Sequence, residues 1–373
     1  MTGEHFTLNG RPVDATTVQR GQFRPRSASE SEALAFLKEW YGPAEGIALQ
    51  SSGSTGAPKR FLASRDAMRA SAALSNRIFG LSAGRTALLA LPLTYIAGKM
   101  MLVRALVGGL NLQLVDPDSR ILSRLDEALG PGEPCRFAPL VPMQLSRALE
   151  QPGGLAGLER IDCVLVGGGF VDPALEDALQ TTSCHLYASY GMTETLSHIA
   201  LRRLNGPERS SWYTPLPGVS LRLNDDACLV ISAPHLGVFD LVTNDRAELR
   251  GDGCFRILGR RDAVINSGGI KIQAEALEEQ LHAATGLTLL LVGTPHRLLG
   301  SCLTLLIEGR PRPEQEQALQ RACEALEPHL RPRRRLVLDQ LPRTSSGKIA
   351  RAKAQAIARE HFAAADGEEH ADH

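Results

Sequence analysis

The stretch that decides the fold is SSGSTGAPKR at residues 51–60, which combines three serines, a threonine and two glycines with two cations at its end. Glycine lets a backbone turn tightly and approach a ligand closely. Successive backbone N–H groups form an anion-binding concavity, hydroxyl groups bond anionic oxygens, and Lys59 adds a point charge. We interpret the run as a polyphosphate loop, although its spacing is not that of a P-loop NTPase. A flexible Ser/Gly linker is the alternative.

Around this loop, short apolar runs alternate with helical patterns between residues 47 and 190. A helix is predicted over residues 64–79, with Ser64 as its N-cap, and another over residues 98–109. The predicted strands are IALQ (47–50), TALLALPL (86–93), NLQLV (111–115), CRFAPLV (135–141), IDCVLVGGG (161–169) and CHLYASYG (184–191). Their runs are apolar almost throughout, which is typical of strands buried in a mostly parallel sheet. We expect the loops after these strands to meet in one site.

The pattern changes after residue 216, where short strands with polar turns indicate a small antiparallel subdomain. From residue 263, alternating strand and helix patterns predict an α+β unit of ordinary domain size. The predicted fold class is therefore α/β, with a large N-terminal domain of mostly parallel sheets and helices plus that antiparallel subdomain, followed by an α+β C-terminal domain. The predicted boundaries are 1–258 for the first domain, 263–360 for the second and 361–373 for an acidic, disordered tail.

Composition excludes several classes of protein. The 373 residues are 43% hydrophobic and 22% charged, and the formal net charge is zero, so no global field favours nucleic acid or an anionic membrane. The N-terminus lacks a signal-peptide pattern, and no apolar run is long enough to span a bilayer. We expect a cytoplasmic protein with free thiols, because the scattered cysteines form no C-x-x-C pair: Cys135, Cys163, Cys184, Cys228, Cys254, Cys302 and Cys323.

Residues 51–59 resemble the phosphate loop of the adenylate-forming superfamily, which includes acyl-CoA synthetases, luciferases and nonribosomal adenylation domains. Further stretches match that family in its own order. They are VGGG (166–169), YGMTET (190–195), TND (243–245), GRRDAVINSGGIKI (259–272) and PRTSSGK (342–348). The resemblance thus covers most of the chain from residue 51 onward, and it is specific because the motifs keep their order.

The resemblance implies a role for each stretch. The glycines at 167–169 would lie against adenine, Thr193 would bond the α-phosphate, and Glu194 would hold Mg²⁺, which prefers oxygen ligands. Asn244 replaces the family's glycine, and we expect the turn to survive because asparagine tolerates a left-handed backbone. The implied ATP- and AMP-binding residues are Ser51, Ser52, Gly53, Ser54, Thr55, Gly56, Lys59, Gly167, Gly168, Gly169, Ser189, Tyr190, Gly191, Thr193, Asp245 and Arg260.

The C-terminal motifs imply a two-step reaction with ATP, Mg²⁺ and coenzyme A. Lys348 would contact the carboxylate and the α-phosphate during adenylation, so Lys348, Thr193 and Glu194 are the predicted catalytic residues. In the family the small domain then rotates about a hinge, predicted here at 259–262 with Asp262 as the hinge residue. That rotation would bring Gly268 and Gly269 to line the tunnel for the coenzyme A thiol.

The phosphate loop begins after only about fifty residues, a compactness that resembles short o-succinylbenzoate–CoA ligases of menaquinone biosynthesis. The segment LPLTYIAGKMM (91–101) is similar to the family's L-P-x-x-H-x-x-G stretch near the acyl site, with Tyr95 in place of histidine. Such a diacid keeps a second carboxylate that needs cations or donors. The predicted acyl-site residues are Tyr95, Lys99, Ser197 and His198, with Arg104 as a further candidate cation.

Alternatives remain open at this point. Lys99 and Arg104 also fit a solvated helix face, and His198 fits a core histidine. The basic run at 331–335 fits either a solvated face or a contact with the 3′-phosphate of coenzyme A. The chain could also act on another aryl or acyl acid, load a carrier-protein thiol, or bind nucleotide without catalysis. No nucleic acid or membrane partner is expected, and the oligomeric state is left open.

Overall fold

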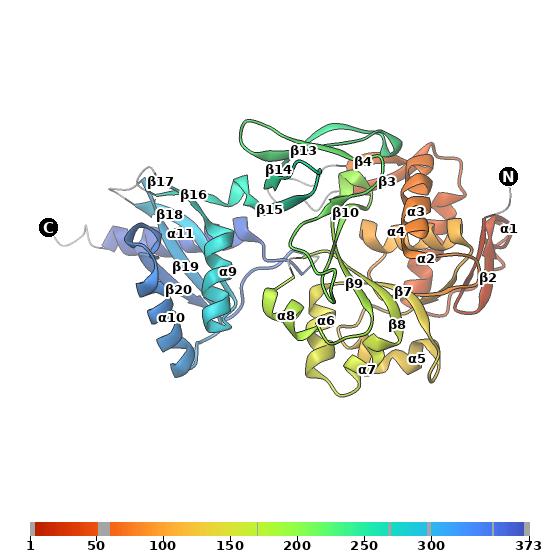
Figure 1. The fold of residues 1–373 in the computed structure, drawn as a ribbon, viewed down its shortest axis with the longest axis horizontal. Coiled ribbons are helices and arrows are strands. Elements are labelled where there is room, and N and C mark those ends of the chain that lie inside the picture. The colour runs from red at the N-terminus through yellow and green to blue at the C-terminus, as the bar shows by residue number, and fades with distance from the viewer. Residues whose placement is uncertain are drawn as a thin grey trace.

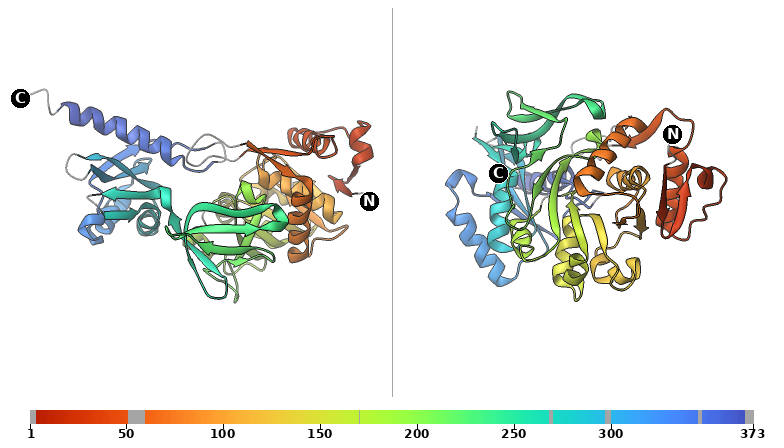
Figure 2. Two further views of the ribbon diagram at one scale, coloured as in Figure 1. Left: turned by 90° about the horizontal axis from the view of Figure 1, so that it is seen from above. Right: turned by 45° about the vertical axis from the view of Figure 1, so that its right-hand side comes forward.

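The computed structural model describes residues 4–50, 60–169, 171–267, 270–296, 300–344 and 347–368. Figure 1 shows a large N-terminal portion beside a smaller C-terminal portion coloured cyan to blue, and the left view of Figure 2 also shows the two portions apart. The prediction that the tail is disordered from residue 361 is wrong for residues 361–368, because helix α11 (Arg351–Glu368) continues through them. No helix among the described residues is long and apolar enough to cross a membrane.

A nine-stranded sheet forms the frame of the large portion. Its strands, in spatial order, are β11 (Thr214–Pro215), β10 (His198–Arg203), β9 (His185–Gly191), β8 (Ile161–Val166), β7 (Cys135–Leu140), β5 (Thr86–Leu89), β6 (Asn111–Leu114), β1 (His5–Leu8) and β2 (Arg11–Asp14). The six strands from β9 to β1 in this order run parallel, and β10, β11 and β2 are antiparallel additions at the two edges. The predicted mostly parallel sheet is therefore confirmed.

Helices cover both faces of this sheet. Alternate residues of the buried strands point to opposite faces, so they belong to two separate hydrophobic cores. Leu89 and Leu165 belong to one core and Leu88 and Val164 to the other, as expected from the two-residue period of a strand. Helices α2 (Ala28–Trp40), α3 (Arg65–Phe79) and α4 (Ile96–Gly108) contribute to the first core. The second core includes α5 (Leu125–Leu129), α6 (Pro142–Glu150), α7 (Gly154–Glu159) and α8 (Pro173–Ala178).

Local sequence signals correctly predicted the helix that follows the predicted phosphate loop. Helix α3 begins after Ser64, whose hydroxyl accepts a hydrogen bond from the Ala67 N–H at 3.0 Å, so the predicted N-cap is confirmed. The helix ends at Gly80, which has a left-handed backbone conformation that suits glycine. All seven cysteines are free, as predicted, and five of them are buried.

Residues 46–64 differ from the sequence expectation. Strand β3 (Gly46–Gln50) does not join the large sheet but pairs antiparallel with β4 (Arg60–Ser64), a strand that the sequence analysis missed. Strand β3 exposes Ala48 and Gln50, whereas the central strand β5 is buried along nearly its whole length. The predicted phosphate loop at 51–59, which lies outside the described residues, therefore joins the two strands of a hairpin. The N-terminal elements α1 (Ala15–Gln19) and α2 were also not predicted.

The predicted antiparallel subdomain is a four-stranded sheet of β12 (Ser220–Leu223), β13 (Cys228–Ala233), β14 (Val238–Leu249) and β15 (Phe255–Arg260). The C-terminal portion then contains a hairpin of β16 (Val264–Ser267) and β17 (Ile270–Gln273). Its three-stranded sheet consists of β18 (Leu289–His296), β19 (Gly300–Glu308) and β20 (Arg334–Leu338), and its other helices are α9 (Ala274–Thr285) and α10 (Pro313–Ala325). The expected α+β character is thus confirmed.

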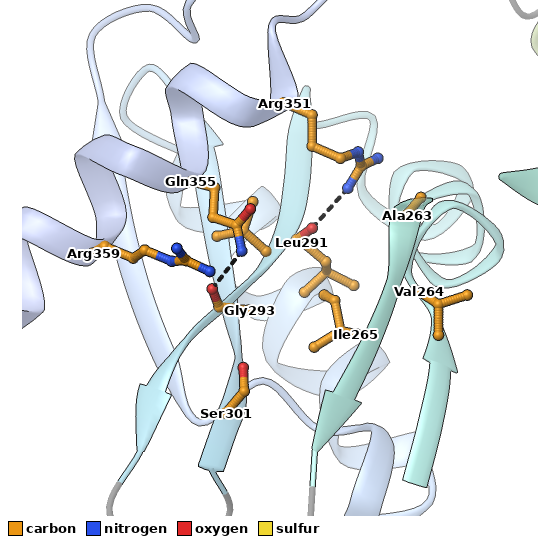
Figure 3. Close-up of a pocket in the computed structure, with 10 residues that line it drawn as sticks. Ala263, Val264, Ile265, Leu291, Gly293, Ser301, Arg351, Gln355 and Arg359 are labelled. Atoms are coloured by element: carbon orange, nitrogen blue, oxygen red, sulfur yellow. Dashed lines mark hydrogen bonds between the residues drawn. The ribbon is translucent and has the colours of Figure 1, made fainter. Parts of the chain in front are cut away.

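Helix α11 is fixed to the edge of this sheet by side chains that reach backbone carbonyls, as Figure 3 shows. Arg351 donates to the Leu291 carbonyl at 2.8 Å, and Gln355 donates to the Gly293 carbonyl at 2.8 Å. Arg351 also forms two hydrogen bonds to the carboxylate of Glu278 in α9, at 2.8 and 2.7 Å. The pocket beside these residues contains none of the predicted site residues.

Replacing Arg351 with alanine is expected to destabilise the protein by about 1–3 kcal/mol, because it removes a two-pronged charged contact and leaves the Glu278 carboxylate without it. Thermal unfolding of the variant, compared with an Arg351→Lys variant that keeps the charge, measures this effect. An unchanged unfolding midpoint in the alanine variant would contradict it.

Candidate active site

Loops that follow neighbouring parallel strands meet at one edge of the large sheet, whereas the predicted phosphate loop at 51–59 follows β3, which is not part of that sheet. Gly167 follows β8, and its N–H donates to the Leu140 carbonyl at the end of β7 at 3.0 Å. Ser189 in β9 donates to the carbonyl of Val166 at 2.9 Å. A Cβ on Gly167 would lie 2.8 Å from the Ser189 hydroxyl oxygen, so this position favours glycine. Two predicted nucleotide-binding stretches are therefore in direct contact.

The turn that carries Thr193 and Glu194 is held tightly at both ends. It is a 3₁₀ turn over Thr193–Thr195 that links Gly191, at the end of β9, to the start of β10. The Thr195 hydroxyl oxygen accepts from the Met192 N–H at 3.0 Å and lies 2.8 Å from the Ser197 carbonyl oxygen. A Cβ on Gly191 would lie 2.3 Å from that same carbonyl oxygen, so no side chain fits there.

Glu194 is the one predicted metal ligand, and its surroundings suit a weakly held cation. Among the described residues no cluster of three His, Cys, Asp or Glu side chains could hold a metal ion. Glu194 is half-buried, and no hydrogen bond or ion pair from a described residue occupies its carboxylate. A single free carboxylate fits Mg²⁺, which proteins often hold by one or two carboxylates together with substrate phosphates.

Tyr190, Asp245 and Arg260 form a polar cluster where the large sheet meets the antiparallel sheet. The Tyr190 hydroxyl donates to one carboxylate oxygen of Asp245 at 2.7 Å, and Arg260 donates to the other at 3.1 Å. Asp245 and Arg260 are cross-strand partners on β14 and β15. Burial, followed by the nearby Asp245 carboxylate, raises the pKa of Tyr190, so the phenol stays protonated and remains a donor.

Lys348 reaches this cluster from the C-terminal portion. It is exposed at the surface, yet neighbouring protein atoms withdraw its ammonium group from water enough to lower its pKa. The Arg260 cation acts in the same direction and the Asp245 carboxylate in the opposite one. Its turn is closed by a hydrogen bond from the Thr344 N–H to the Lys348 carbonyl at 2.7 Å. Lysine, arginine and carboxylate from three separate elements thus lie within electrostatic reach of one another.

The two portions contact each other through α9, and one of these contacts involves Arg260 of the cluster. The Arg260 N–H donates to the Glu275 carboxylate of α9 at 2.8 Å. Gly259 has a φ of 126°, a region that favours glycine, and a Cβ there would lie 3.2 Å from the same carboxylate. His282 of α9 pairs with Asp172, the N-cap of α8, at 2.6 Å. The backbone of the predicted hinge is therefore tied to the C-terminal portion.

A second polar cluster is buried beside the predicted acyl segment. Arg104 on α4 is only 2% exposed, and it donates to the Ser197 hydroxyl at 2.5 Å and faces Nδ1 of His198 at 3.5 Å. The Nε2 atom of His198 lies 3.3 Å from the Ser75 hydroxyl of α3. The alternative that Arg104 covers a solvated helix face is wrong, because its side chain points into the protein.

This buried cation has no counter-ion among the described residues. No described carboxylate forms an ion pair with Arg104, and its Nε–H is buried without a hydrogen-bond partner in the described chain. Burial lowers the pKa of Arg104 to about 10, which still leaves the guanidinium charged at neutral pH. Tyr95 and Lys99 lie half-buried at the start of the same helix, and no described contact joins either of them to the cluster.

Known proteins share the sequence pattern of this chain. The sequence profile of the AMP-binding enzyme family matches residues 40–234, more than half of the chain. The chain belongs to this adenylate-forming family. The order of its motifs and the meeting of its strand-end loops agree with that membership. It is thus a member of the ATP-dependent, AMP-forming acid–thiol ligases.

Relatives within the family differ in name and in distance. A probable 2-succinylbenzoate–CoA ligase of Mycobacterium tuberculosis is 28% identical over 82% of each chain. The 2-succinylbenzoate–CoA ligase of Lactococcus lactis is 26% identical, over 71% of this chain and 60% of its own. Among solved structures, an acyl-CoA synthetase (AMP-forming)/AMP-acid ligase II-like protein of Dyadobacter fermentans is 34% identical over 90% of this chain and 96% of its own, with a TM-score of 0.59.

The fold of this AMP-binding enzyme is also shared by o-succinylbenzoate CoA synthetase of Bacillus subtilis, solved with an acyl-adenylate intermediate. That likeness has a TM-score of 0.69 at 24% identity and covers 82% of this chain and 68% of the other, so it carries the fold alone.

Several predicted site residues lie outside the described part of the chain, and Asn244 differs from its prediction. Ser51 to Lys59, Gly268 and Gly269 lie outside the described residues, and so does the side chain of Asp262. Asn244 was expected to lie in a turn with a left-handed backbone, and this expectation was wrong. The residue lies within strand β14, and its φ is not positive. Its side chain accepts a hydrogen bond from Arg261 at 3.1 Å. An extended strand accommodates asparagine as readily as glycine.

Two residues of α3 that were not predicted belong to the buried polar cluster around Arg104. Ser75 contacts His198, and Asn76 donates to the Arg104 carbonyl at 3.0 Å. Both residues are buried in a helix whose other inward positions are largely apolar. Polar residues on the apolar face of a helix are the signal that could have found them.

Proposed function

We propose that this chain is an ATP-dependent o-succinylbenzoate–CoA ligase that acts in menaquinone biosynthesis. Its membership of the adenylate-forming enzymes supports the reaction class, and the names of its relatives support this acid. The observation that carries the choice of a diacid is the buried Arg104 cluster.

A buried cation without a counter-ion is unfavourable by an amount on the order of several kcal/mol. Natural chains keep such a group where a ligand supplies the missing charge. Arg104 retains an unpartnered Nε–H, and Ser197 and His198, beside it, follow closely after Glu194. A substrate with two carboxylates can place one at the α-phosphate of ATP and the other against Arg104. o-Succinylbenzoate has this second carboxylate, whereas benzoate and fatty acids do not.

The first step would join a carboxylate oxygen of the acid to the α-phosphorus of ATP and break the bond to the departing pyrophosphate. Both reactants are anions, so catalysis depends on positioning and on charge stabilisation. Lys348 would approach the developing charge, with Thr193 at the α-phosphate. Asp245, held by Tyr190 and Arg260, would receive the ribose hydroxyls.

Two further groups complete the proposed chemistry. Mg²⁺, held by Glu194 and the phosphates, would neutralise phosphate charge when bound. In the second step the thiol of coenzyme A would form the thioester bond and release AMP, with Gly268 and Gly269 as the proposed tunnel residues.

ATP–pyrophosphate exchange across a panel of acids tests this proposal. We expect exchange with o-succinylbenzoate and much less with benzoate or fatty acids. Exchange with those monoacids but not with the diacid would overturn the substrate, and transfer only to a carrier-protein thiol would overturn coenzyme A as acceptor. ATP binding without exchange on any acid would indicate a non-catalytic nucleotide-binding protein instead, although Lys348 and Glu194 are both present.

A further inference from the structure

Arg104 is linked to a second helix through one imidazole ring. Its Nη2 atom faces both the Ser197 hydroxyl, at 2.5 Å, and Nδ1 of His198, at 3.5 Å. The other side of the ring, at Nε2, lies 3.3 Å from the hydroxyl of Ser75 on α3. His198 and Ser75 are both buried, at 7% and 1% exposure, so water does not compete for these contacts.

These contacts fix the tautomer of His198. Arginine can only donate hydrogen bonds, so the Nδ1 atom that faces Arg104 must be an acceptor without a proton. The Ser197 hydroxyl accepts from Arg104, which leaves its own proton free to bond the same Nδ1 at 3.1 Å. The ring proton is therefore on Nε2, where it donates to Ser75.

The ring is also neutral. Burial, and then the positive charge of Arg104, lower the pKa of His198 well below its ordinary value. A neutral acceptor holds the guanidinium in place without cancelling its charge. A carboxylate at position 198 would hold Arg104 as firmly, but it would neutralise the cation and repel an incoming anion.

We propose that His198 and Ser75 are positioning residues that keep Arg104 oriented and charged, and that they thereby select acids with a second carboxylate. This inference rests on the proposed function, since it assumes that Arg104 meets that carboxylate. Ser75 acts through His198: it binds Nε2–H and so keeps Nδ1 turned towards the guanidinium. Neither residue touches the reacting atoms.

The test compares apparent KM values in ATP–pyrophosphate exchange. Ser75→Ala is expected to raise KM for o-succinylbenzoate by about 2- to 12-fold, the effect of one lost hydrogen bond, with KM for ATP unchanged. His198→Leu is expected to raise it further, and His198→Asn, whose side-chain oxygen can take the place of Nδ1, should restore much of the loss.

Ser71→Ala is the matched control, since Ser71 is buried on the same helix and has no described contact with His198. Imidazole ¹⁵N shifts add a readout that simple destabilisation would not move: the wild type should show the Nε2–H tautomer, and Ser75→Ala should shift the Nε2 signal, because Nε2–H loses its acceptor.

The failures of the two proposals can be told apart. A wild-type protein that activates only monocarboxylic acids would overturn both the substrate and this inference. A wild-type protein that activates the diacid, with KM unaltered in Ser75→Ala and His198→Leu, would overturn the inference alone. Equal rises in KM for ATP and for the acid would also overturn it, because they would indicate a general disturbance of the fold.

Discussion

Replacing Lys348 with alanine is expected to reduce the rate of ATP–pyrophosphate exchange by about 100- to 1,000-fold, which is typical when one preorganised group that stabilises transition-state charge is removed. Lys348 lies within electrostatic reach of both Asp245 and Arg260, and the proposed reaction brings two anions together there. The stability of the protein should change little, because the side chain is exposed. Exchange rates and thermal unfolding of the variant measure the two effects.

Two controls make this result specific. Lys353→Ala removes an exposed lysine of α11 that no described contact joins to the Asp245 cluster, and it should leave exchange unaltered. Lys59→Ala, in the predicted phosphate loop, should be milder than Lys348→Ala because that loop is proposed to bind the departing phosphates. The reverse order would mean that the two lysines have exchanged roles.

The environment of Lys348 also predicts how the rate of ATP–pyrophosphate exchange changes with pH. Its pKa lies below the ordinary lysine value, first through withdrawal from water and then through Arg260. The charged form is present below that pKa and is lost as pH rises through it. Exchange should therefore decline on the alkaline side before an ordinary lysine would titrate, whereas Lys348→Arg should lose this decline.

Much of the large portion could be predicted because its signals are local. The buried strands β5, β7 and β8 are short, mostly apolar runs, a pattern that is typical of strands buried on both faces of a sheet. Ser64 marks the start of α3 for the same reason, since a cap and its helix are adjacent in sequence.

The hairpin of β3 and β4 and the cluster around Asp245 could not be predicted from such signals. A strand pattern does not state which sheet the strand joins, so β3 was expected in the large sheet and was found in a separate hairpin. Tyr190, Asp245, Arg260 and Lys348 come from four segments, and only the resemblance to a family brought them together in advance. Asn244 shows the limit of that route, because the family's glycine suggested a turn where this chain has an extended strand.

Replacing Arg104 with methionine is expected to have opposite effects on substrate binding and on stability. Loss of a charged hydrogen-bonding partner should raise KM for o-succinylbenzoate by about 10- to 150-fold, the equivalent of about 1.5–3 kcal/mol, and leave KM for ATP unchanged. The folded protein should become more stable, because an apolar side chain replaces a buried charge without a counter-ion. Ser197 and His198 would remain paired with each other at 3.1 Å and leave no new buried group unsatisfied.

This combination of effects separates a binding residue from a structural one. If Arg104 were structural, its replacement would lower the stability of the protein and change KM for all acids alike. A residue that is kept for its ligand instead lowers the stability of the unliganded protein. Lys99→Ala is the matched comparison on the same helix, and it should affect the diacid less than Arg104→Met does, because Lys99 is half-buried and no described contact joins it to the cluster. If Arg104→Met unfolds at a lower temperature and Lys99→Ala raises KM more, the second carboxylate binds at Lys99 and the buried arginine serves the fold.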